Sequence, residues 1–345
     1  MPLELTVSAG PKTHFRDTPI PTPGDDQLVI KVVVSGSNPK DWKRPEFQNS
    51  NRNEGDDIAG IVHQVGKNVR DFKPGDRVAA FHEPGTPHGS YAEYAVASDH
   101  TTFPIPDNIS FEEAATIPLA AGTALVGLFK NLRLSAPWTP ATDPTPLLVY
   151  GGSTSVGSFA IKLARQANIH PIIAVAGKGA SYVETLLDST KGDAIVDYRK
   201  GADAVVQELQ AALKKAAPSF THFPFAFDAV SEHGSTDIVG KVIDPKGAAT
   251  FVLRYNADSL PPTVRHTLTF AVDVHNDVAA NRDLGFVGFR YFGKGLRDGW
   301  FSGHPFEVRE NGLAGVEAAL NDLKNGKASA VKYVFRIADT PQLKA

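Results

Sequence analysis

A glycine-rich segment near the middle of the chain carries the residues most suited to bind a phosphate. Leu147–Tyr150 has the pattern of a buried strand, Gly151–Gly157 that of a tight turn, and the residues up to Gln166 that of a helix. The start of a helix offers free N–H groups and a positive dipole end to a pyrophosphate, and glycines let the backbone approach it. Three hydroxyl side chains in the turn could add donors: Ser153, Thr154 and Ser155.

The turn departs from a strict G-x-G-x-x-G motif because serine and threonine replace the central glycine. A purely structural turn between a strand and a helix is therefore the alternative interpretation. The alternation of strands and helices further along the chain favours a dinucleotide site.

The end of the next strand bears on which dinucleotide is bound. An NAD site usually has Asp or Glu at this position, which accepts hydrogen bonds from the ribose 2′-OH. Here no acid follows Pro171–Ala176, whereas Lys178 and Ser181 offer a cation and a hydroxyl suited to a 2′-phosphate. A solvated loop lysine is the alternative, but the sequence favours NADPH.

The composition excludes several other kinds of chemistry. The chain has 345 residues, of which 42% are hydrophobic and 21% charged, with a net charge of −3 and no cysteine. Disulfides, thiolate nucleophiles, iron–sulfur clusters and zinc sites that need sulfur are thereby removed. The near-neutral charge gives no reason to expect nucleic acid or an acidic membrane surface as a partner. Because no signal-peptide core or membrane-spanning run is evident, we expect a soluble, cytoplasmic protein.

Two kinds of secondary structure must position these residues. Short apolar runs alternate with turns in the first hundred residues, as in Leu28–Gly36 and Asp56–Gly66, which is typical of a small, partly open β-barrel. Ser110 could cap a helix. From Leu147 onward strands alternate with helices, the pattern of a doubly wound parallel sheet. The tail, with a predicted helix at Leu313–Leu323 and a strand after it, is similar to the head, so the α/β domain is expected to be inserted into the barrel domain.

Eight short motifs follow one another along essentially the whole chain. They are Asn38-Pro39-Lys40-Asp41-Trp42-Lys43, Gly55–Val62 with Val65-Gly66, Lys73–Val78, Gly89–Tyr94, Ala114–Pro118 with Gly122–Ala124, Gly151–Gly157, Asp197-Tyr198 and Asn325–Val334. In order and spacing they resemble the medium-chain dehydrogenase/reductase superfamily. The resemblance is greatest to its zinc-free quinone oxidoreductase-like branch, particularly the fungal trans-acting enoyl reductases.

This resemblance implies a division of the chain into two domains. A GroES-like β-barrel domain, residues 1–119 and 289–345, would contact the substrate, and an inserted Rossmann domain, residues 120–288, would bind NADPH. The active site would lie in the cleft between them. Asn38, Lys43 and Thr123 would lie near the nicotinamide. The implied cofactor-binding residues are Pro39, Gly152, Ser153, Thr154, Ser155 and Val156, then Lys178, Ser181 and Tyr198 around the 2′-phosphate, and Leu253 through its backbone at the nicotinamide end.

Each candidate catalytic residue has a plainer alternative role. Lys43 could stabilise a developing enolate oxygen or bind cofactor, although most lysines are simply solvated. Asn38 could bond the cofactor or substrate, or serve only to form the turn before a proline. Thr123 could bond the carboxamide or bond back within its own helix. The aromatic segment Phe286–Phe292 could line an apolar substrate pocket, or form interdomain core or a dimer edge.

The chain departs from zinc-dependent relatives at the positions that would hold the metal. Those relatives use a cysteine after the first barrel strand, the histidine of a Gly-His-Glu motif, and a later cysteine or acid. The matching segments here, Ser35–Asn38 and Gly55–Asp57, contain neither cysteine nor histidine. His82-Glu83 with His88 lacks the spacing of a tetrahedral site, and loop histidines are usually solvated. We therefore expect no metal, and without a Lewis acid ordinary alcohol oxidation is not expected.

NADPH without zinc can still deliver a hydride to an acceptor that is already electrophilic. The expected reaction is hydride transfer from C4 of NADPH to the β-carbon of an enone or enoyl thioester, or to a quinone, with a proton from water or a nearby donor. The substrate is then a small apolar or conjugated molecule. Three alternatives remain: an enoyl reductase active only on carrier-bound chains of a polyketide synthase, an NADPH-binding protein with little turnover, and a zinc alcohol dehydrogenase. Monomer and homodimer are both compatible with the sequence.

Overall fold

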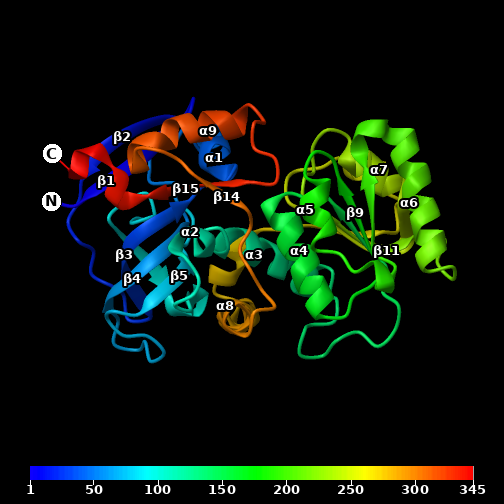
Figure 1. The fold of residues 1–345 in the computed structure, drawn as a ribbon, viewed down its shortest axis with the longest axis horizontal. Helices are drawn as coiled ribbons and strands as arrows, with labels where there is room; N and C mark the ends of the chain where they lie inside the picture. The colour runs from blue at the N-terminus through cyan, green and yellow to red at the C-terminus, as the bar shows by residue number, and fades with distance from the viewer. Residues whose placement is uncertain (345) are drawn as a thin grey trace. The chain divides into compact units, whose positions relative to one another are not determined.

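The computed structural model describes residues 1–344 and divides into two compact units. Unit 1 contains Met1–Gly122 together with the chain from Val272 onward, and unit 2 contains Thr123–Ala271 (Figure 1). One unit is thus inserted into the other, as the sequence predicts. The expected boundary at residue 289 falls inside helix α8 (Ala279–Asp298), which contacts the strand Thr102–Pro104 of unit 1. No helix of residues 1–344 is long and apolar enough to cross a bilayer.

Unit 1 is built around a seven-stranded sheet with order β14-β15-β3-β4-β5-β7, in which β6 also pairs with β3. A separate antiparallel pair, β1–β2, completes its strands. The strands are β1 (Leu3–Ser8), β2 (Lys12–Asp17), β3 (Gln27–Gly36), β4 (Asp57–Val65), β5 (Arg77–Phe81), β6 (Tyr94–Ser98), β7 (Thr102–Pro104), β14 (Phe306–Val308) and β15 (Lys332–Arg336). Its helices are α1 (Lys40–Gln48), α2 (Phe111–Ala114), the first part of α3 (Pro118–Leu125), α8, and α9 (Val316–Lys324).

Strand β3 joins the head of the chain to its tail. Its β-branched sequence, QLVIKVVVSG, suits a buried strand, and it pairs antiparallel with β4, β6 and β15. The β3–β15 register sets Gly36 opposite Val334, so residues almost 300 positions apart become neighbours. The predicted strands and the Ser110 cap, whose hydroxyl accepts the N–H of Glu113, are confirmed. The predicted tail helix begins as a 3₁₀ turn, Gly312–Gly315, before α9.

Unit 2 is a six-stranded parallel sheet of order β10-β9-β8-β11-β12-β13. Numbered within the unit this is 3-2-1-4-5-6, the order of a dinucleotide-binding sheet. The strands are β8 (Leu147–Tyr150), β9 (Ile172–Ala176), β10 (Ala194–Asp197), β11 (Phe223–Asp228), β12 (Ile243–Phe251) and β13 (Arg265–Leu268). The helices are α4 (Ser155–Gln166), α5 (Ala180–Glu184), α6 (Ala202–Ala216) and α7 (Ser235–Val242), with a π-helical segment at Val126–Asn131.

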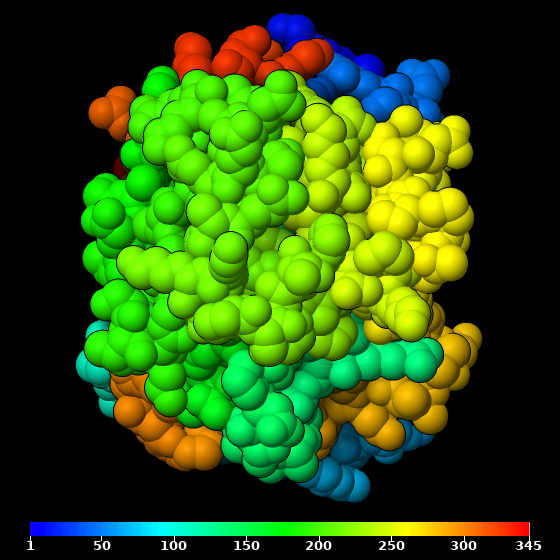
Figure 2. Space-filling model, turned by 90° about the vertical axis from the view of Figure 1, so that its right-hand side faces the viewer, coloured from blue at the N-terminus to red at the C-terminus, as the bar shows by residue number. Residues whose placement is uncertain are grey.

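The helices of unit 2 cover its sheet from both sides. Helices α4 and α5 contact β8 to β10, while α6 and α7 lie on the other side, toward the right in Figure 1. The second pair faces the viewer in Figure 2, where the chain is coloured green to yellow. Because both faces are covered, the strands are almost continuously apolar, as in the fully buried β8 and β9. The predicted α/β pattern is confirmed.

The core of unit 2 can be tested at Phe251, which is fully buried at the end of β12 and stacks on Tyr255 with ring centroids 3.9 Å apart. We expect Phe251→Ala to lower the free energy of unfolding by about 3–5 kcal/mol, because it leaves a cavity in a close-packed core. Urea unfolding measures this change. Phe270→Ala is the matched control, since that side chain is 51% exposed. Equal losses for both variants would contradict the assignment of Phe251 to the core.

Candidate functional site

The predicted phosphate turn is held rigidly at the start of α4. Gly151 has a positive φ of 82°. A Cβ on Gly157 would lie 2.2 Å from the Gly151 carbonyl oxygen, so only glycine allows this close approach. The Thr154 hydroxyl accepts the N–H of Gly157 at 3.0 Å and donates to the Gly151 carbonyl at 2.9 Å. Its proton is therefore used inside the turn, and Thr154 acts as the helix cap rather than as the free donor that we expected.

The remaining residues of the turn lie where an anion could reach them. Gly152 is buried, whereas Ser153, Ser155 and Val156 are half-buried at the first turn of α4. The free N–H groups of a twelve-residue helix point toward this edge of the sheet. Strand order reverses beside β8, and ligands of open α/β sheets bind at the carboxyl ends of strands at such a point. The geometry therefore suits a pyrophosphate.

The residues predicted to surround a 2′-phosphate follow two neighbouring strands, β9 and β10. Lys178 and Ser181 are exposed just after β9, and Tyr198 is 50% exposed just after β10. The parallel pairing of Ala176 with Asp197 brings these strand ends together. The Tyr198 ring lies against Gly177, where an added Cβ would be 2.4 Å from the ring. The structure thus brings Lys178, Ser181 and Tyr198 to one edge of unit 2.

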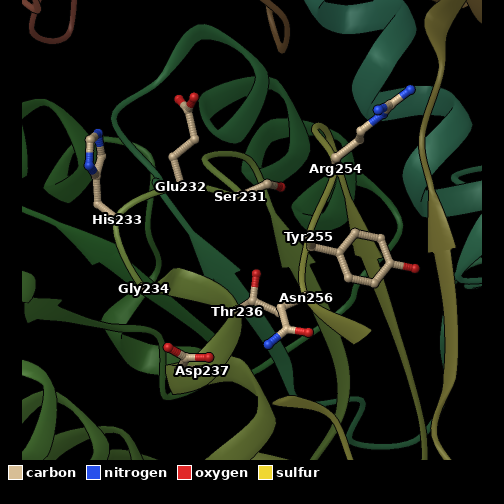
Figure 3. Close-up of a pocket in the computed structure, with 9 residues that line it drawn as sticks. All are labelled: Ser231, Glu232, His233, Gly234, Thr236, Asp237, Arg254, Tyr255 and Asn256. Atoms are coloured by element: carbon tan, nitrogen blue, oxygen red, sulfur yellow. The ribbon is translucent and has the colours of Figure 1, made fainter. Parts of the chain in front are cut away.

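The ends of β11 and β12 border an open hollow of about 430 Å³ (Figure 3). Its loop contains positive φ angles at Ser231, His233 and Gly234. Asp228 holds this loop, because its buried carboxylate accepts the N–H of Ser231 at 2.8 Å and the hydroxyl of Ser235 at 2.6 Å. Burial raises the pKa of Asp228. Our sequence reasoning missed this residue, although an acid directly after the apolar run FPFAF is a signal of such a role.

Leu253 lies in a bend after β12 and is half-buried. It is followed by Arg254, which lines the hollow. Thr123 belongs to α3, is 6% exposed, and is grouped with unit 2, whereas Asn38 and Lys43 belong to unit 1.

Asn38 is buried in a polar network of unit 1. Its side-chain N–H donates to Asp57 Oδ2 at 2.6 Å, and its side-chain oxygen accepts from Lys332 Nζ at 3.1 Å. The residue is 4% exposed. Its amide is thus engaged on both sides, which supports the alternative role that we gave it, in forming the turn.

Lys332 and Asp57 form the centre of this network. Their ion pair measures 2.5 Å, and both side chains are buried. The second oxygen of Asp57 accepts the backbone N–H of Leu119 at 2.7 Å, and Lys332 also donates to the Thr116 carbonyl. One buried pair therefore joins β15, β4 and the start of α3. Sequence reasoning missed both residues, because a lysine in a strand is normally taken as solvent-facing.

The other two residues of the predicted turn lie on or beside α1. Pro39 precedes the helix with a φ of −56°. Lys43 is half-buried, and its ammonium lies 5.5 Å from the centroid of the Trp42 ring. Lys43 is therefore a partly exposed cation, and its predicted role near the substrate stays a prediction.

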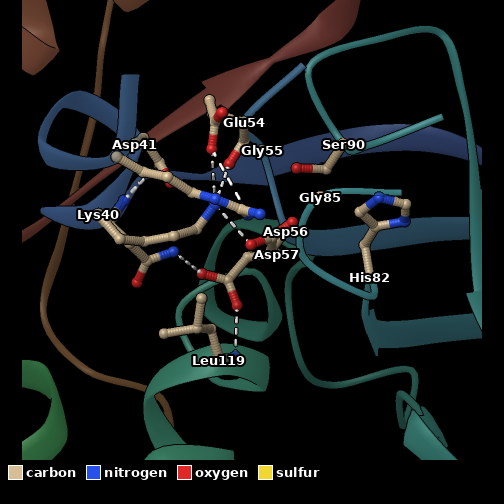
Figure 4. A network of polar contacts seen from close by, with 12 residues as sticks. Lys40, Asp41, Glu54, Gly55, Asp56, Asp57, His82, Gly85, Ser90 and Leu119 are labelled. Carbon is tan, nitrogen blue, oxygen red and sulfur yellow. Dashed lines mark hydrogen bonds and ion pairs between the residues drawn. The ribbon is translucent and has the colours of Figure 1, made fainter. Parts of the chain in front are cut away.

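Lys40, which sequence reasoning passed over, is the lysine that enters the interior. Its ammonium lies 2.5 Å from Asp56 Oδ2, 3.0 Å from Asp41 Oδ1 and 3.7 Å from Glu54 Oε2 (Figure 4). The Tyr91 hydroxyl donates to Asp41 at 2.6 Å. We call Lys40, Asp41, Glu54 and Asp56 the Lys40 cluster.

Burial controls the titration of the Lys40 cluster. It raises the pKa of Asp41 and of Asp56 to about 6 and that of Glu54 to about 7, against the opposing effect of Lys40. Burial alone would lower the pKa of Lys40, but the three carboxylates raise it overall. The acids therefore titrate near neutral pH while the lysine stays charged.

The aromatic segment Phe286–Phe292 contributes two side chains to the core of unit 1. Phe289 and Phe292 are fully buried and contact Phe103 with ring centroids 6.2 and 6.1 Å away. Phe286 is 41% exposed. Phe289 and Phe292 thus belong to the core of unit 1 itself, a role that our sequence reasoning did not consider.

Comparison with known proteins places this geometry in a family. A model of the alcohol dehydrogenase GroES-like domain matches residues 24–107. The trans-enoyl reductase fsr4 of Gibberella fujikuroi is 44% identical over 311 residues, covering 88% of this chain and 90% of that protein. The chain belongs to the trans-enoyl reductase branch of the medium-chain dehydrogenase/reductase superfamily. The resemblance inferred from the motifs is thereby confirmed.

Solved structures share the fold of this trans-enoyl reductase family member at low identity. A putative zinc-dependent alcohol dehydrogenase from Rhizobium etli has a TM-score of 0.81 at 21% identity, covering 97% of this chain and 98% of that chain. The 2-octenoyl-CoA carboxylase reductase CinF from Streptomyces, solved with NADP and 2-octenoyl-CoA, has a TM-score of 0.73 at 17% identity, covering 99% and 91%. These likenesses support the fold and not the choice of substrate.

The residues of this family member do not fit a catalytic zinc ion. At the segments that would hold zinc, the Lys332 ammonium engages Asn38 and Asp57, and the Lys40 ammonium engages Asp56. Zinc in such sites takes sulfur, imidazole or carboxylate ligands, and a charged ammonium beside them opposes a metal cation. His82 is not solvated as we expected, because it is 1% exposed and bonds the Val96 carbonyl at 2.8 Å. Among residues 1–344 no group of three His, Cys, Asp or Glu side chains is placed so that it could hold a metal ion.

The raised pKa values of the Lys40 cluster predict how stability depends on pH. A carboxyl group with a higher pKa in the folded than in the unfolded state binds more protons when folded, so stability rises as pH falls from 8 through 7 and 6. Glu54→Gln removes one such group. Between pH 8 and pH 6, the Tm of the Glu54→Gln variant should therefore rise a few degrees less than the Tm of the wild type. Differential scanning calorimetry measures this difference.

Glu46→Gln is the control for this experiment, because Glu46 lies on α1 and forms a partly exposed ion pair with Lys324 of α9. Histidines such as His275, whose pKa burial lowers to about 3, act in the opposite direction, so only the difference between variants is informative. An identical pH dependence in Glu54→Gln and the wild type would contradict the titration of this cluster.

Proposed function

We propose that this protein is an NADPH-dependent, zinc-independent enoyl reductase that acts in trans on enoyl thioesters carried by a polyketide synthase. The observation that carries this proposal is the 44% identity to a trans-enoyl reductase across 88% of the chain. The rigid turn at the start of α4, and the Lys40 and Lys332 ammonium groups that engage Asp56 and Asp57, support it independently. The partner and the carrier-bound substrate are inferred from the family.

The proposed choice of NADPH rests on the edge of unit 2. No acid follows β9, and the exposed Lys178 and Ser181 lie at that strand end with Tyr198 beside them. The N–H groups at the start of α4 would hold the pyrophosphate, and the backbone near Leu253 would meet the nicotinamide end. NADPH, when bound, supplies the hydride.

The chain's own residues would then orient the reactants and accommodate charge. Addition of a hydride to the β-carbon of an enoyl thioester leaves negative charge on the thioester oxygen. Lys43, partly exposed on α1, is the cation that we assign to this charge. Asn38 holds the turn that leads into α1, so its role is positioning. The proton for the α-carbon comes from water in this scheme.

The activity test measures NADPH oxidation with a panel of acceptors, in the presence and absence of a chelator. We expect chelator-insensitive turnover of enoyl thioesters on a carrier protein, and slower turnover of free enones and quinones. NADH and protein lacking substrate serve as controls. Equal or faster turnover of free quinones would favour a quinone reductase, and loss of activity on chelation would contradict zinc independence.

The assignment of Lys178 predicts a cofactor-specific defect. An exposed ammonium–phosphate contact contributes modestly, so Lys178→Ala should raise the Kd of NADPH roughly 3–10-fold while leaving that of NADH almost unchanged. Titration of cofactor fluorescence measures both constants. Lys214→Ala, an exposed lysine on α6, is the matched control. An equal effect on the two cofactors would remove Lys178 from the 2′-phosphate site.

A further inference from the structure

The Lys40 ammonium lies where three buried carboxylates converge from two segments. Asp41 is on α1, whereas Glu54 and Asp56 precede β4. Their exposed fractions are 0%, 1% and 0%. Lys40 also donates to the backbone carbonyl of Glu54. The chain has therefore enclosed a single primary ammonium with acceptors that face it from different directions (Figure 4).

Two of the three carboxylates depend on this one cation. Glu54 also lies 3.8 Å from Arg44 and from Arg52. Among residues 1–344, Asp41 and Asp56 have Lys40 as their ion-pair partner, and Asp56 Oδ1 has no hydrogen-bond partner. A buried carboxylate without a cation is costly, so removal of the ammonium leaves a demand for positive charge that either a proton or another cation can meet.

The distances identify the kind of cation that fits. The nitrogen-to-oxygen separations of 2.5, 3.0 and 3.7 Å resemble ammonium contacts, whereas Ca²⁺ or Mg²⁺ needs several oxygens within about 2.0–2.6 Å. The Lys40 side chain is 25% exposed, while the acids around it are closed to solvent. Lys40 is thus the one member of the cluster whose side chain is partly open to solvent.

The cluster is also connected to the turn that carries two candidate site residues. Asp41 Oδ2 accepts the backbone N–H of Asn38 at 2.8 Å, and its other oxygen faces Lys40. Lys43 lies three residues further along α1. Asp41 thus links the backbone of this turn to the Lys40 ammonium.

We propose that the Lys40 cluster is a binding site for a primary alkylammonium, filled in the native protein by the Lys40 side chain, which makes Lys40 a positioning residue for the turn at residues 38–43. Lys40→Ala removes the tethered ammonium and leaves its carboxylates in place. A free alkylammonium of similar length then binds in the vacated space.

The test is chemical rescue of Lys40→Ala, read out by thermal unfolding. We expect the substitution to lower Tm by roughly 5–15 °C, because it breaks buried ion pairs. Propylammonium or butylammonium at constant ionic strength should recover part of this loss with saturation, whereas tetramethylammonium, which has no N–H donor, should not. Lys67→Ala, at a lysine that is 72% exposed, should show no loss and no response. No loss in Lys40→Ala, equal effects of all salts, or selective recovery by Mg²⁺ would overturn the proposal.

A second variant keeps the test decisive if Lys40→Ala does not fold. Lys40→Met combined with Asp56→Asn removes one cation and one anion, so it should fold better than Lys40→Ala and should not respond to alkylammonium. Refolding of Lys40→Ala should then give soluble protein with propylammonium and none with tetramethylammonium. The proposal would be overturned if the double variant folded no better than Lys40→Ala. It would also be overturned if propylammonium and tetramethylammonium gave the same yield of refolded Lys40→Ala.

The positioning role has its own readout, which rests on the proposed function. In Lys40→Ala, kcat for enoyl reduction should fall and should recover with propylammonium at the same midpoint concentration as Tm. Absence of turnover in the wild type would count against the proposed function alone, because the recovery of Tm is measured without substrate. Recovery of Tm without recovery of kcat would overturn the positioning role.

Discussion

The buried ion pair between Lys332 and Asp57 is the interaction on which unit 1 depends most. It joins the first residue of β15 to the first residue of β4, and Asp57 also accepts hydrogen bonds from Asn38 in the turn before α1 and from Leu119 in α3. Removing one partner of such a pair leaves the other charge buried without compensation. Unit 1 is formed by two segments of the chain that are separated in sequence by the whole of unit 2. The contact that joins these two segments therefore has to select the correct partner as well as stabilise the fold. The β3–β15 ladder supplies the backbone part of the same closure.

Local sequence patterns predicted the elements because the physics that forms them is local. The apolar, β-branched run at Leu28–Gly36 became β3, and the strand, turn and helix around Gly151–Gly157 formed as expected. Gly157 approaches the Gly151 carbonyl so closely that residue 157 cannot carry a side chain. Glycine at this spacing therefore indicated the tight turn. The similarity of head and tail predicted the insertion, since both ends contribute strands to one sheet.

Pairings over long distances could not be predicted in the same way. Lys40 and Lys43 are three residues apart and chemically identical, yet one is enclosed by carboxylates and the other lies over Trp42. Which of the two turns inward depends on Glu54 and Asp56, whose positions are set by the start of β4. The partner of Thr154 was also not predictable, because its hydroxyl was expected to face a ligand and instead caps α4. A single sequence reveals the residue types but not the partner that each one finds.

The two units differ in where their charged groups lie: at the surface in the predicted anion site of unit 2, and in the interior in the Lys40 cluster of unit 1. Unit 2 offers an anion the uncharged N–H groups of a helix start and an exposed lysine at a strand end, where ionic partners can exchange. Unit 1 balances the carboxylates of Asp41, Glu54 and Asp56 against Lys40, Arg44 and Arg52 within its interior. An ammonium already engaged by carboxylates has little potential left to stabilise a developing oxyanion, as a metal ion would. The acceptor that we propose, an enoyl thioester, spreads the added negative charge within itself and therefore needs little further stabilisation from the protein.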